Sequence, residues 1–175
     1  NSPFTAQKLI VENDVEATLL GIANGQPTTL LISGTGAICF SFNGKKTVRA
    51  GGWGHRVGDE GSGYWIGQQV AKAIFRAADG RDEPTILTDL VLSSNHIANV
   101  DALMNWLYNA DYTNARLAGF SSYVQQAVEC GDKAAVKIAK EAANELALLA
   151  TATLKKADYH QGAHTFFING GVLKN

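Results

Sequence analysis

The sequence predicts an α/β fold, because three short β-type runs precede a long helical region and a fourth β-type run follows it. The first three runs cover residues 30–32, 37–42 and 47–50, and the fourth covers residues 165–168. Residues 84–156 between them have helical periodicity. With 175 residues, of which 46% are hydrophobic and 18% are charged, the chain can bury one sizeable core.

The strands are expected to form an antiparallel unit preceded by a short strand and helix. A β-type run at residues 9–11 leads to a helix at residues 15–23, for which Asn13 or Asp14 is a suitable N-cap. Asn43 and Gly44 both tolerate positive φ, which predicts a two-residue hairpin between the second and third core strands. Three consecutive strands joined in this way are antiparallel.

The expected helices have recognisable ends. Ser62 is a suitable cap for a helix through residues 66–74, and Asp79 and Gly80 are expected to end that helix. A long helix is predicted to begin at Asp132, and its last turn places two lysines, Lys155 and Lys156, near the negative pole of the helix dipole.

Charge and composition exclude several classes of protein. The net charge is −1, and no Lys or Arg run exceeds two residues, so we expect no nucleic acid partner. The sequence contains neither a signal segment nor an apolar run long enough to span a bilayer, so we expect a cytoplasmic protein with no membrane partner. Cys39 and Cys130 have no metal-ligand spacing, and we expect both to be buried free thiols.

Glycines concentrate in one region of the chain. Ten of the 18 glycines lie between Gly34 and Gly67, together with Trp53, which favours a binding site over a flexible linker. The turn Gly34-Thr35-Gly36 follows a strand, and its exposed amides and the Thr35 hydroxyl suit a phosphate group. The alternative is that this turn only reverses the chain.

Three carboxylates lie at breaks between elements, where side chains can converge on a ligand. Asp14 is either a helix cap or a functional carboxylate, and Asp59 and Glu60 either bind a ligand or complement a helix N-terminus. His55 is either functional or an ordinary surface or core residue. Trp53 lies among glycines and is suited to form a wall against a sugar or a base.

Taken together, these segments resemble the N-acetylglucosamine kinase family. The similarity lies in residues 31–36, in Gly51-Gly52-Trp53-Gly54-His55, and in residues 58–66. Residues 13–14, 116–120 and 170–172 match further family motifs in order. Glucosamine kinases and the ATPases that activate benzoyl-CoA reductase and related dehydratases share these motifs.

The resemblance implies a ribonuclease-H-like fold of the sugar kinase and actin superfamily, with a mixed sheet and packing helices. It implies that Asp14 is the general base. The implied ATP contacts are Gly34, Thr35, Gly36, Ala118, Gly170 and Gly171. The implied sugar contacts are Ala37, Ile38, Gly52, Trp53 and Asp59. Animal-type members have Asn at the position of Ile38, so the resemblance does not fix the sugar.

The resemblance also implies ATP and Mg²⁺ as cofactors, an amino sugar as substrate and a homodimer as a possible assembly, with no metal ligand named in the chain. Residues 1–24 are expected to be the last strand and helix of an N-terminal lobe, and residues 25–175 a C-terminal lobe truncated at its end. The family's first phosphate loop, an Asp-Gly-Gly-Gly-Thr-like hairpin, is not found, so we expect no ATP turnover by this chain alone. The alternative functions are an activator-type ATPase and a non-catalytic sugar-sensing module.

Overall fold

The computed structural model describes residues 14–159 and 163–174, in which four strands form one mixed sheet. The strands are β1 (Thr28–Ser33), β2 (Ala37–Phe42), β3 (Thr47–Gly51) and β4 (Thr165–Asn169). Their order is β3-β2-β1-β4, with β1, β2 and β3 antiparallel and β4 parallel to β1. The predicted antiparallel unit and the later strand are therefore confirmed.

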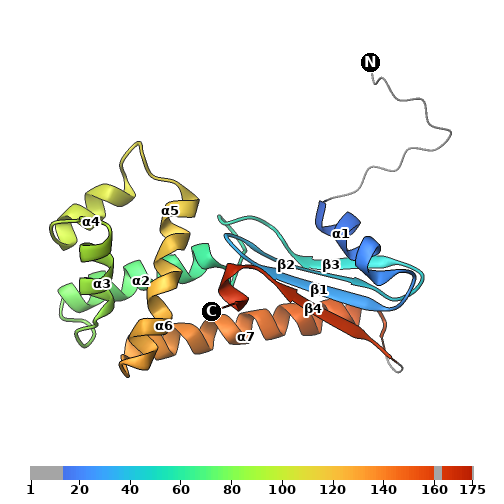
Figure 1. Ribbon diagram of the computed structural model, residues 1–175. Coiled ribbons are helices and arrows are strands. Elements are labelled where there is room, and N and C mark those ends of the chain that lie inside the picture. Colours follow the sequence, from blue (N-terminus) through green and yellow to red (C-terminus); the bar gives the residue numbers. More distant parts are fainter. Residues whose placement is uncertain (1–13, 160–162, 175) are drawn as a thin grey trace, which may run out of the picture.

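Helices cover the sheet and form a second region beside it (Figure 1). The α-helices are α1 (Asp14–Ala23), α2 (Gly63–Ala78), α3 (Leu87–Ser94), α4 (Val100–Leu107), α5 (Asn114–Ala118), α6 (Ser122–Glu129) and α7 (Lys133–Lys156). Two 3₁₀-helices are η1 (Gly119–Ser121) and η2 (Gly171–Leu173). The long helix α7 passes under the sheet and continues into the helical region, which joins the two parts.

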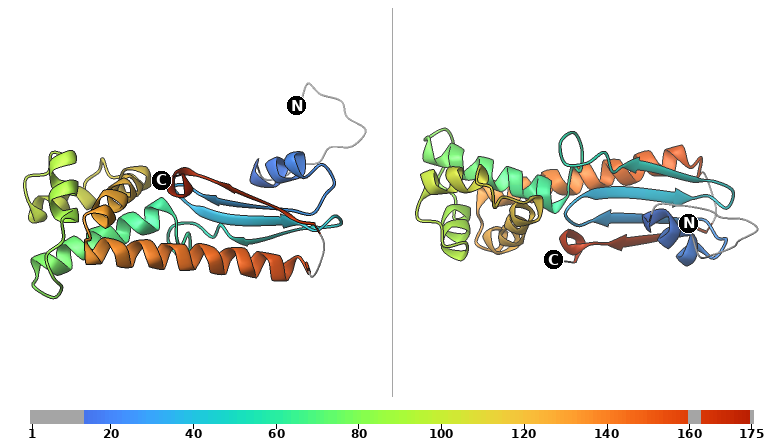
Figure 2. Two further views of the ribbon diagram at one scale, coloured as in Figure 1. Left: turned by 60° about the horizontal axis from the view of Figure 1, so that its bottom comes forward. Right: turned by 90° about the horizontal axis from the view of Figure 1, so that it is seen from above.

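The sheet lies between two helices, with α1 on one face and α7 on the other (Figure 2). Successive side chains of a strand point to opposite faces. Leu30 and Phe40 therefore pack with Leu19 of α1, on what we call the α1 face. Leu31 and Cys39 pack with Leu146 of α7, on the α7 face.

The helical region has its own core, centred on α2. Val70 and Ile74 are fully buried with residues of α3 and α4. A Cβ at Gly67 would lie 2.1 Å from the carbonyl oxygen of Leu117, so only glycine allows α5 to pack this closely on α2. This contact positions Ala118, the last residue of α5, next to Gly63 at the start of α2.

The expected helix ends are confirmed. The Ser62 hydroxyl accepts a hydrogen bond from the Trp65 amide, and Asp132 caps α7 by accepting from the Ala135 amide. α2 ends at Ala78 with Asp79 as its C-cap, and Gly80 follows with a φ of 72°.

The β2–β3 hairpin is confirmed, but its turn lies one residue later than expected. The amide of Asn43 donates to the carbonyl of Lys46, so Gly44 and Lys45 form the two-residue loop. Gly44 has positive φ and Asn43 does not. The Asn43 side chain instead accepts hydrogen bonds from the amides of Lys45 and Lys46, and these bonds stabilise the loop from the residue that precedes it.

The two cysteines differ, which corrects the expectation that both are buried. Cys39 is fully buried, whereas Cys130 is exposed at the end of α6. The apolar residues around Cys130 in the sequence suggested that it is buried. It is exposed because it follows the last turn of α6 and points away from the core. Burial raises the pKa of the Cys39 thiol to about 11, and a hydrogen bond with Thr153 opposes that increase.

Of the two thiols in this chain, we therefore expect only Cys130 to react fast in the folded state. At pH 8 an aromatic disulfide reagent should modify Cys130 rapidly and Cys39 only after unfolding, because the thiolate is the reactive form. Cys130→Ser should abolish the fast phase and Cys39→Ser should leave it unchanged. Two fast thiols in the native protein would contradict the burial of Cys39.

The strand predicted at residues 9–11 and the candidate cap Asn13 lie outside the described residues. The predicted boundary at residue 24 stays a prediction, and α1 packs against β1 and β2. Within the described part of the chain, no helix combines the length and the apolar character needed to cross a bilayer.

Candidate functional site

The turn Gly34-Thr35-Gly36 joins β1 to β2 and is attached to the start of α2. The amide of Gly63 donates to the carbonyl of Gly34 at 2.7 Å, and the amide of Tyr64 donates to the carbonyl of Thr35 at 3.2 Å. The Gly34 amide donates to the Gly36 carbonyl at 2.9 Å, inside the turn. All three carbonyl groups are thus used within the protein.

The remaining donors of this turn have no acceptor among residues 14–159 and 163–174. Among the described residues, nothing accepts a hydrogen bond from the amides of Thr35 and Gly36 or from the Thr35 hydroxyl. Thr35 is exposed and Gly36 is half-buried, so the Thr35 groups are open to solvent. Consecutive free amides in a tight turn, with a hydroxyl beside them, form a concave group of donors suited to an anion.

The six residues for which ATP contacts are predicted come together at one edge of the sheet. β1 and β4 are parallel, with Ile32 opposite Asn169, so the turns that follow them lie side by side. Gly170 has a φ of 113°, and a Cβ there would lie 2.0 Å from the Ser33 carbonyl oxygen. Gly171 begins η2 directly after it.

Ala118 reaches the same edge through α2. A Cβ at Gly63 would lie 3.5 Å from the Ala118 Cβ and 3.0 Å from the Gly34 carbonyl oxygen. Helix α5 therefore lies close to the turn through the start of α2. We call this edge, with residues 34–36, 118 and 170–171, the carboxyl edge, because the parallel strands β1 and β4 end there.

The five residues for which sugar contacts are predicted also lie together. The Gly52 amide donates to the Ala37 carbonyl at 3.0 Å, and a Cβ at Gly52 would lie 2.3 Å from Ile38 Cδ1. Trp53 follows and is 69% exposed, so its ring is available to a ligand. Asp59 completes the group.

Asp59 joins the two sets of residues. Its Oδ1 accepts a hydrogen bond from the Ala37 amide at 3.3 Å, and a Cβ at Gly36 would lie 3.0 Å from its Oδ2. Asp59 has a φ of 60°, a conformation that Asp adopts more readily than most residues. Next to it, the buried Ser33 hydroxyl donates to the Gly61 carbonyl at 2.9 Å and fixes the loop against β1.

Asp14 does not contact the other candidate residues. It is the exposed first residue of α1, and its Oδ1 accepts a hydrogen bond from the Val15 amide at 2.9 Å. However, Val15 and Ile38 both pack against the same cluster on the α1 face. Asp14 therefore lies on the face of the sheet that also carries Ile38.

Sequence reasoning gave no role to Tyr64, which links the site to the helical region. The ring of His55 contacts the Tyr64 ring edge-on, with centroids 5.1 Å apart, and the Tyr112 hydroxyl donates to the Tyr64 hydroxyl at 3.4 Å. Burial, followed by the contact with Tyr64, raises the pKa of Tyr112. His55 thus has a packing role, and its contact depends on tertiary structure that no local signal reveals.

Sequence reasoning also missed Arg49. Its guanidinium lies 4.8 Å from the centroid of the Trp53 ring, and its Nη1 lies 3.4 Å from the carbonyl oxygens of Gly51 and Gly52. The sequence signal that could have indicated a role for Arg49 is its position two residues before the segment Gly51-Gly52-Trp53.

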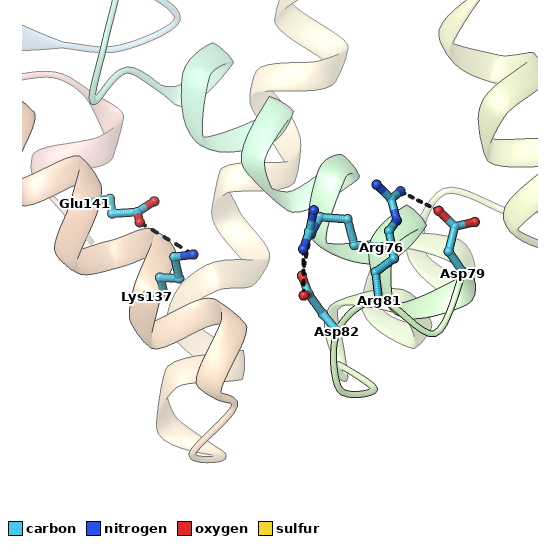
Figure 3. A network of polar contacts seen from close by, with 6 residues as sticks. All are labelled: Arg76, Asp79, Arg81, Asp82, Lys137 and Glu141. Carbon is cyan, nitrogen blue, oxygen red and sulfur yellow. Dashed lines mark hydrogen bonds and ion pairs between the residues drawn. The ribbon is translucent and has the colours of Figure 1, made fainter.

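A groove of about 960 Å³ lies at the far end of α2 from the carboxyl edge. Its walls contain charged side chains that pair with one another, such as Arg76 with Asp82 and Lys137 with Glu141 (Figure 3). The hydrogen bond from Arg76 lowers the pKa of Asp82. Since these charges are largely neutralised in pairs and are separated from the glycine turns by the length of α2, we place the candidate site at the carboxyl edge.

No group of three His, Cys, Asp or Glu side chains that could hold a metal ion occurs among the described residues. Among residues 14–159 and 163–174, the acidic side chains therefore do not gather into a cluster that would hold the implied Mg²⁺ without a nucleotide. Any such ion would depend mainly on oxygen atoms of a nucleotide and water.

Glycine turns at the carboxyl ends of parallel strands are typical of nucleotide-binding α/β proteins. The chain belongs to the BadF/BadG/BcrA/BcrD ATPase family, whose model matches residues 3–175. This match confirms the family resemblance that was inferred from the sequence motifs.

Similar proteins carry sugar kinase names. The N-acetylmuramic acid/N-acetylglucosamine kinase of Clostridium acetobutylicum is 37% identical over 169 residues, which are 96% of this chain and 55% of that protein. The N-acetyl-D-glucosamine kinase of Dictyostelium discoideum is 32% identical over 129 residues, 73% of this chain and 40% of that protein. The chain thus spans about half the length of these curated relatives.

A crystal structure from Chromobacterium violaceum, described as that of a candidate N-acetylglucosamine kinase, has the same fold. Its TM-score is 0.68 with 32% sequence identity, over 90% of this chain and 52% of that one.

Proposed function

We propose that this chain forms the nucleotide- and sugar-binding part of an ATP-dependent amino-sugar kinase with a ribonuclease-H-like fold. The kinase names of the relatives support the activity, and the mixed sheet with β4 parallel to β1 is compatible with the proposed fold. N-acetylglucosamine and N-acetylmuramic acid are the candidate acceptors, since the relative from Clostridium acetobutylicum is named for both.

One observation carries the proposal. The free amides of Thr35 and Gly36 lie beside the proposed sugar residues, and the Asp59 carboxylate contacts both groups. Phosphoryl transfer requires mainly that the acceptor and the phosphate be aligned and that charge be stabilised. A turn for phosphate next to a wall for sugar provides this arrangement.

In the proposed reaction the acceptor hydroxyl attacks the terminal phosphorus of ATP. The new O–P bond forms as the bond to the bridging oxygen of ADP breaks, and the Asp14 carboxylate accepts the hydroxyl proton. The amides of Thr35 and Gly36 donate hydrogen bonds to phosphate oxygens, and Gly170, Gly171 and Ala118 border the adenosine. Trp53 packs against the sugar, and Asp59 accepts hydrogen bonds from its hydroxyl groups.

The direct test is ATP-dependent phosphorylation by the whole protein that contains this chain. Purified protein should convert N-acetylglucosamine or N-acetylmuramic acid, with ATP, to the sugar phosphate and ADP in equal amounts. Glucosamine and glucose complete the panel. If none of the four sugars releases ADP above the sugar-free rate, the kinase proposal is wrong.

Thr35→Ala should weaken nucleotide binding. We expect the Kd for ATP to rise about tenfold, because one hydrogen bond to a charged phosphate is lost while the backbone amides remain. Calorimetric titration measures this Kd. Thr151→Ala is the matched control, since Thr151 is an exposed threonine on α7 whose hydroxyl donates to the Ala147 carbonyl. An unchanged Kd for Thr35→Ala would show that the Thr35 hydroxyl does not contact the phosphate.

A further inference from the structure

Arg49 lies on the face of the sheet where the proposed acceptor would bind. It is directly opposite Phe40 in the β2–β3 register, and directly opposite residues share a face. Phe40 packs with Leu19 of α1, so Arg49 emerges on the α1 face, which is also the face of Asp14 and Ile38.

The Arg49 guanidinium is held in place by its neighbours. It stacks over Trp53 at 4.8 Å from the ring centroid, which is within the range of a cation–π contact. Its Nη1 also lies within 3.4 Å of the carbonyl oxygens of Gly51 and Gly52. These contacts place a positive charge against two of the proposed sugar residues, Gly52 and Trp53.

This charge has no acidic partner in the part of the chain that the structure describes. Arg76 and Arg81, by contrast, each form an ion pair with a neighbouring Asp. All contacts that Arg49 makes with carbonyl oxygens use Nη1, so its Nε and Nη2 donors are free among the described residues. A guanidinium with free donors on one edge matches a carboxylate, which it binds through two parallel hydrogen bonds.

We propose that Arg49 binds a carboxylate carried by the sugar and so selects an acidic amino sugar, such as N-acetylmuramic acid with its lactyl ether. This inference rests on the proposed function and adds to it the residue that determines the acceptor. A neutral sugar can use the same Trp53 wall but leaves the Arg49 donors to water. The acidic sugar gains a charge-assisted contact that the neutral sugar lacks.

The test compares the two sugars in the whole protein. Arg49→Gln should raise the KM for N-acetylmuramic acid at least tenfold and change the KM for N-acetylglucosamine less than threefold. Arg49→Lys should retain part of the preference, since it keeps the charge without the planar pair of donors. Lys45→Gln, at the far turn of the same hairpin, is the control for a general loss of positive charge. Circular dichroism and thermal unfolding check that each variant is folded.

Two outcomes would overturn the role of Arg49. One is an equal loss with both sugars, which would mean that Arg49 only supports the Gly51-Gly52-Trp53 segment. The other is phosphorylation of N-acetylglucosamine by the wild type with no use of N-acetylmuramic acid.

Calorimetric binding of N-acetylmuramic acid separates this inference from the kinase proposal. Binding that weakens at least tenfold in Arg49→Gln, without turnover of any sugar, would support Arg49 as the acid-binding residue and contradict the kinase. Turnover of both sugars with binding that is unchanged in Arg49→Gln would support the kinase and overturn the inference.

Discussion

Replacing Asp14 with Asn is expected to lower kcat for sugar phosphorylation by about 10³-fold, because an amide cannot accept the proton of the acceptor hydroxyl. The Kd for ATP should stay within about threefold of the wild-type value, since the carboxylate acts on the acceptor in the transition state. Steady-state kinetics and nucleotide titration of the whole protein measure both quantities.

The structure makes Asn the informative substitution. Asp14 has a local role, in which its Oδ1 accepts a hydrogen bond from the Val15 amide at the start of α1. The Oδ1 of Asn can accept the same bond, so the helix start is preserved while the basic group is removed. Glu16→Gln is the matched control, because it removes a carboxylate from the same turn of α1. A kcat near the wild-type value for Asp14→Asn would show that Asp14 serves α1 alone and is not the base.

Gly170→Ala is expected to destabilise the protein by about 3 kcal/mol or more, through backbone strain and overlap. Gly170 has a φ of 113° and a ψ of 157°, a region of backbone conformation that is essentially restricted to glycine. The added methyl group would lie 2.0 Å from the carbonyl oxygen of Ser33. That oxygen belongs to the backbone of β1 and cannot move like a flexible side chain.

Gly171→Ala provides the control for Gly170→Ala. It lies one residue later, and a Cβ there would meet no atom within 4 Å. The free energy of unfolding of the Gly171→Ala variant should differ from the wild-type value by less than about 0.5 kcal/mol, as for most substitutions that cause no steric overlap. Urea unfolding followed by circular dichroism measures both variants. Equal stabilities would mean that Gly170 does not lie against Ser33 as described.

Local signals predicted most of the elements. Ser62 was predicted as a cap and Asp132 as a helix start, because the side chain of such a residue bonds to an amide three positions later, within the same segment. The hairpin turn was assigned one residue too early, because Asn43 is compatible with positive φ but uses its side chain to hold the turn. Tolerance of a conformation does not establish that a residue adopts it.

The contacts that form the site could not be predicted in the same way. The hydrogen bonds from Gly63 and Tyr64 to the glycine turn join residues about thirty positions apart, and they require that α2 pack against the end of β1. The pairing of Arg49 with Trp53 depends on the β2–β3 register and on the turn after β3. Sequence motifs identified Gly51 and Gly52. They did not identify Arg49, whose side chain contacts the carbonyl oxygens of both glycines.

The orientation of the glycine turn has a consequence for how it would hold an anion. Its carbonyl groups face the protein, and the amides of Thr35 and Gly36 have no acceptor in the described part of the chain, so oriented dipoles rather than a full positive charge would provide the attraction. Dipoles act over a short range and depend on direction, whereas the attraction between separated charges is screened by added salt. An anion in this turn would therefore be held with little sensitivity to ionic strength, unlike one that is attracted by lysines at a distance.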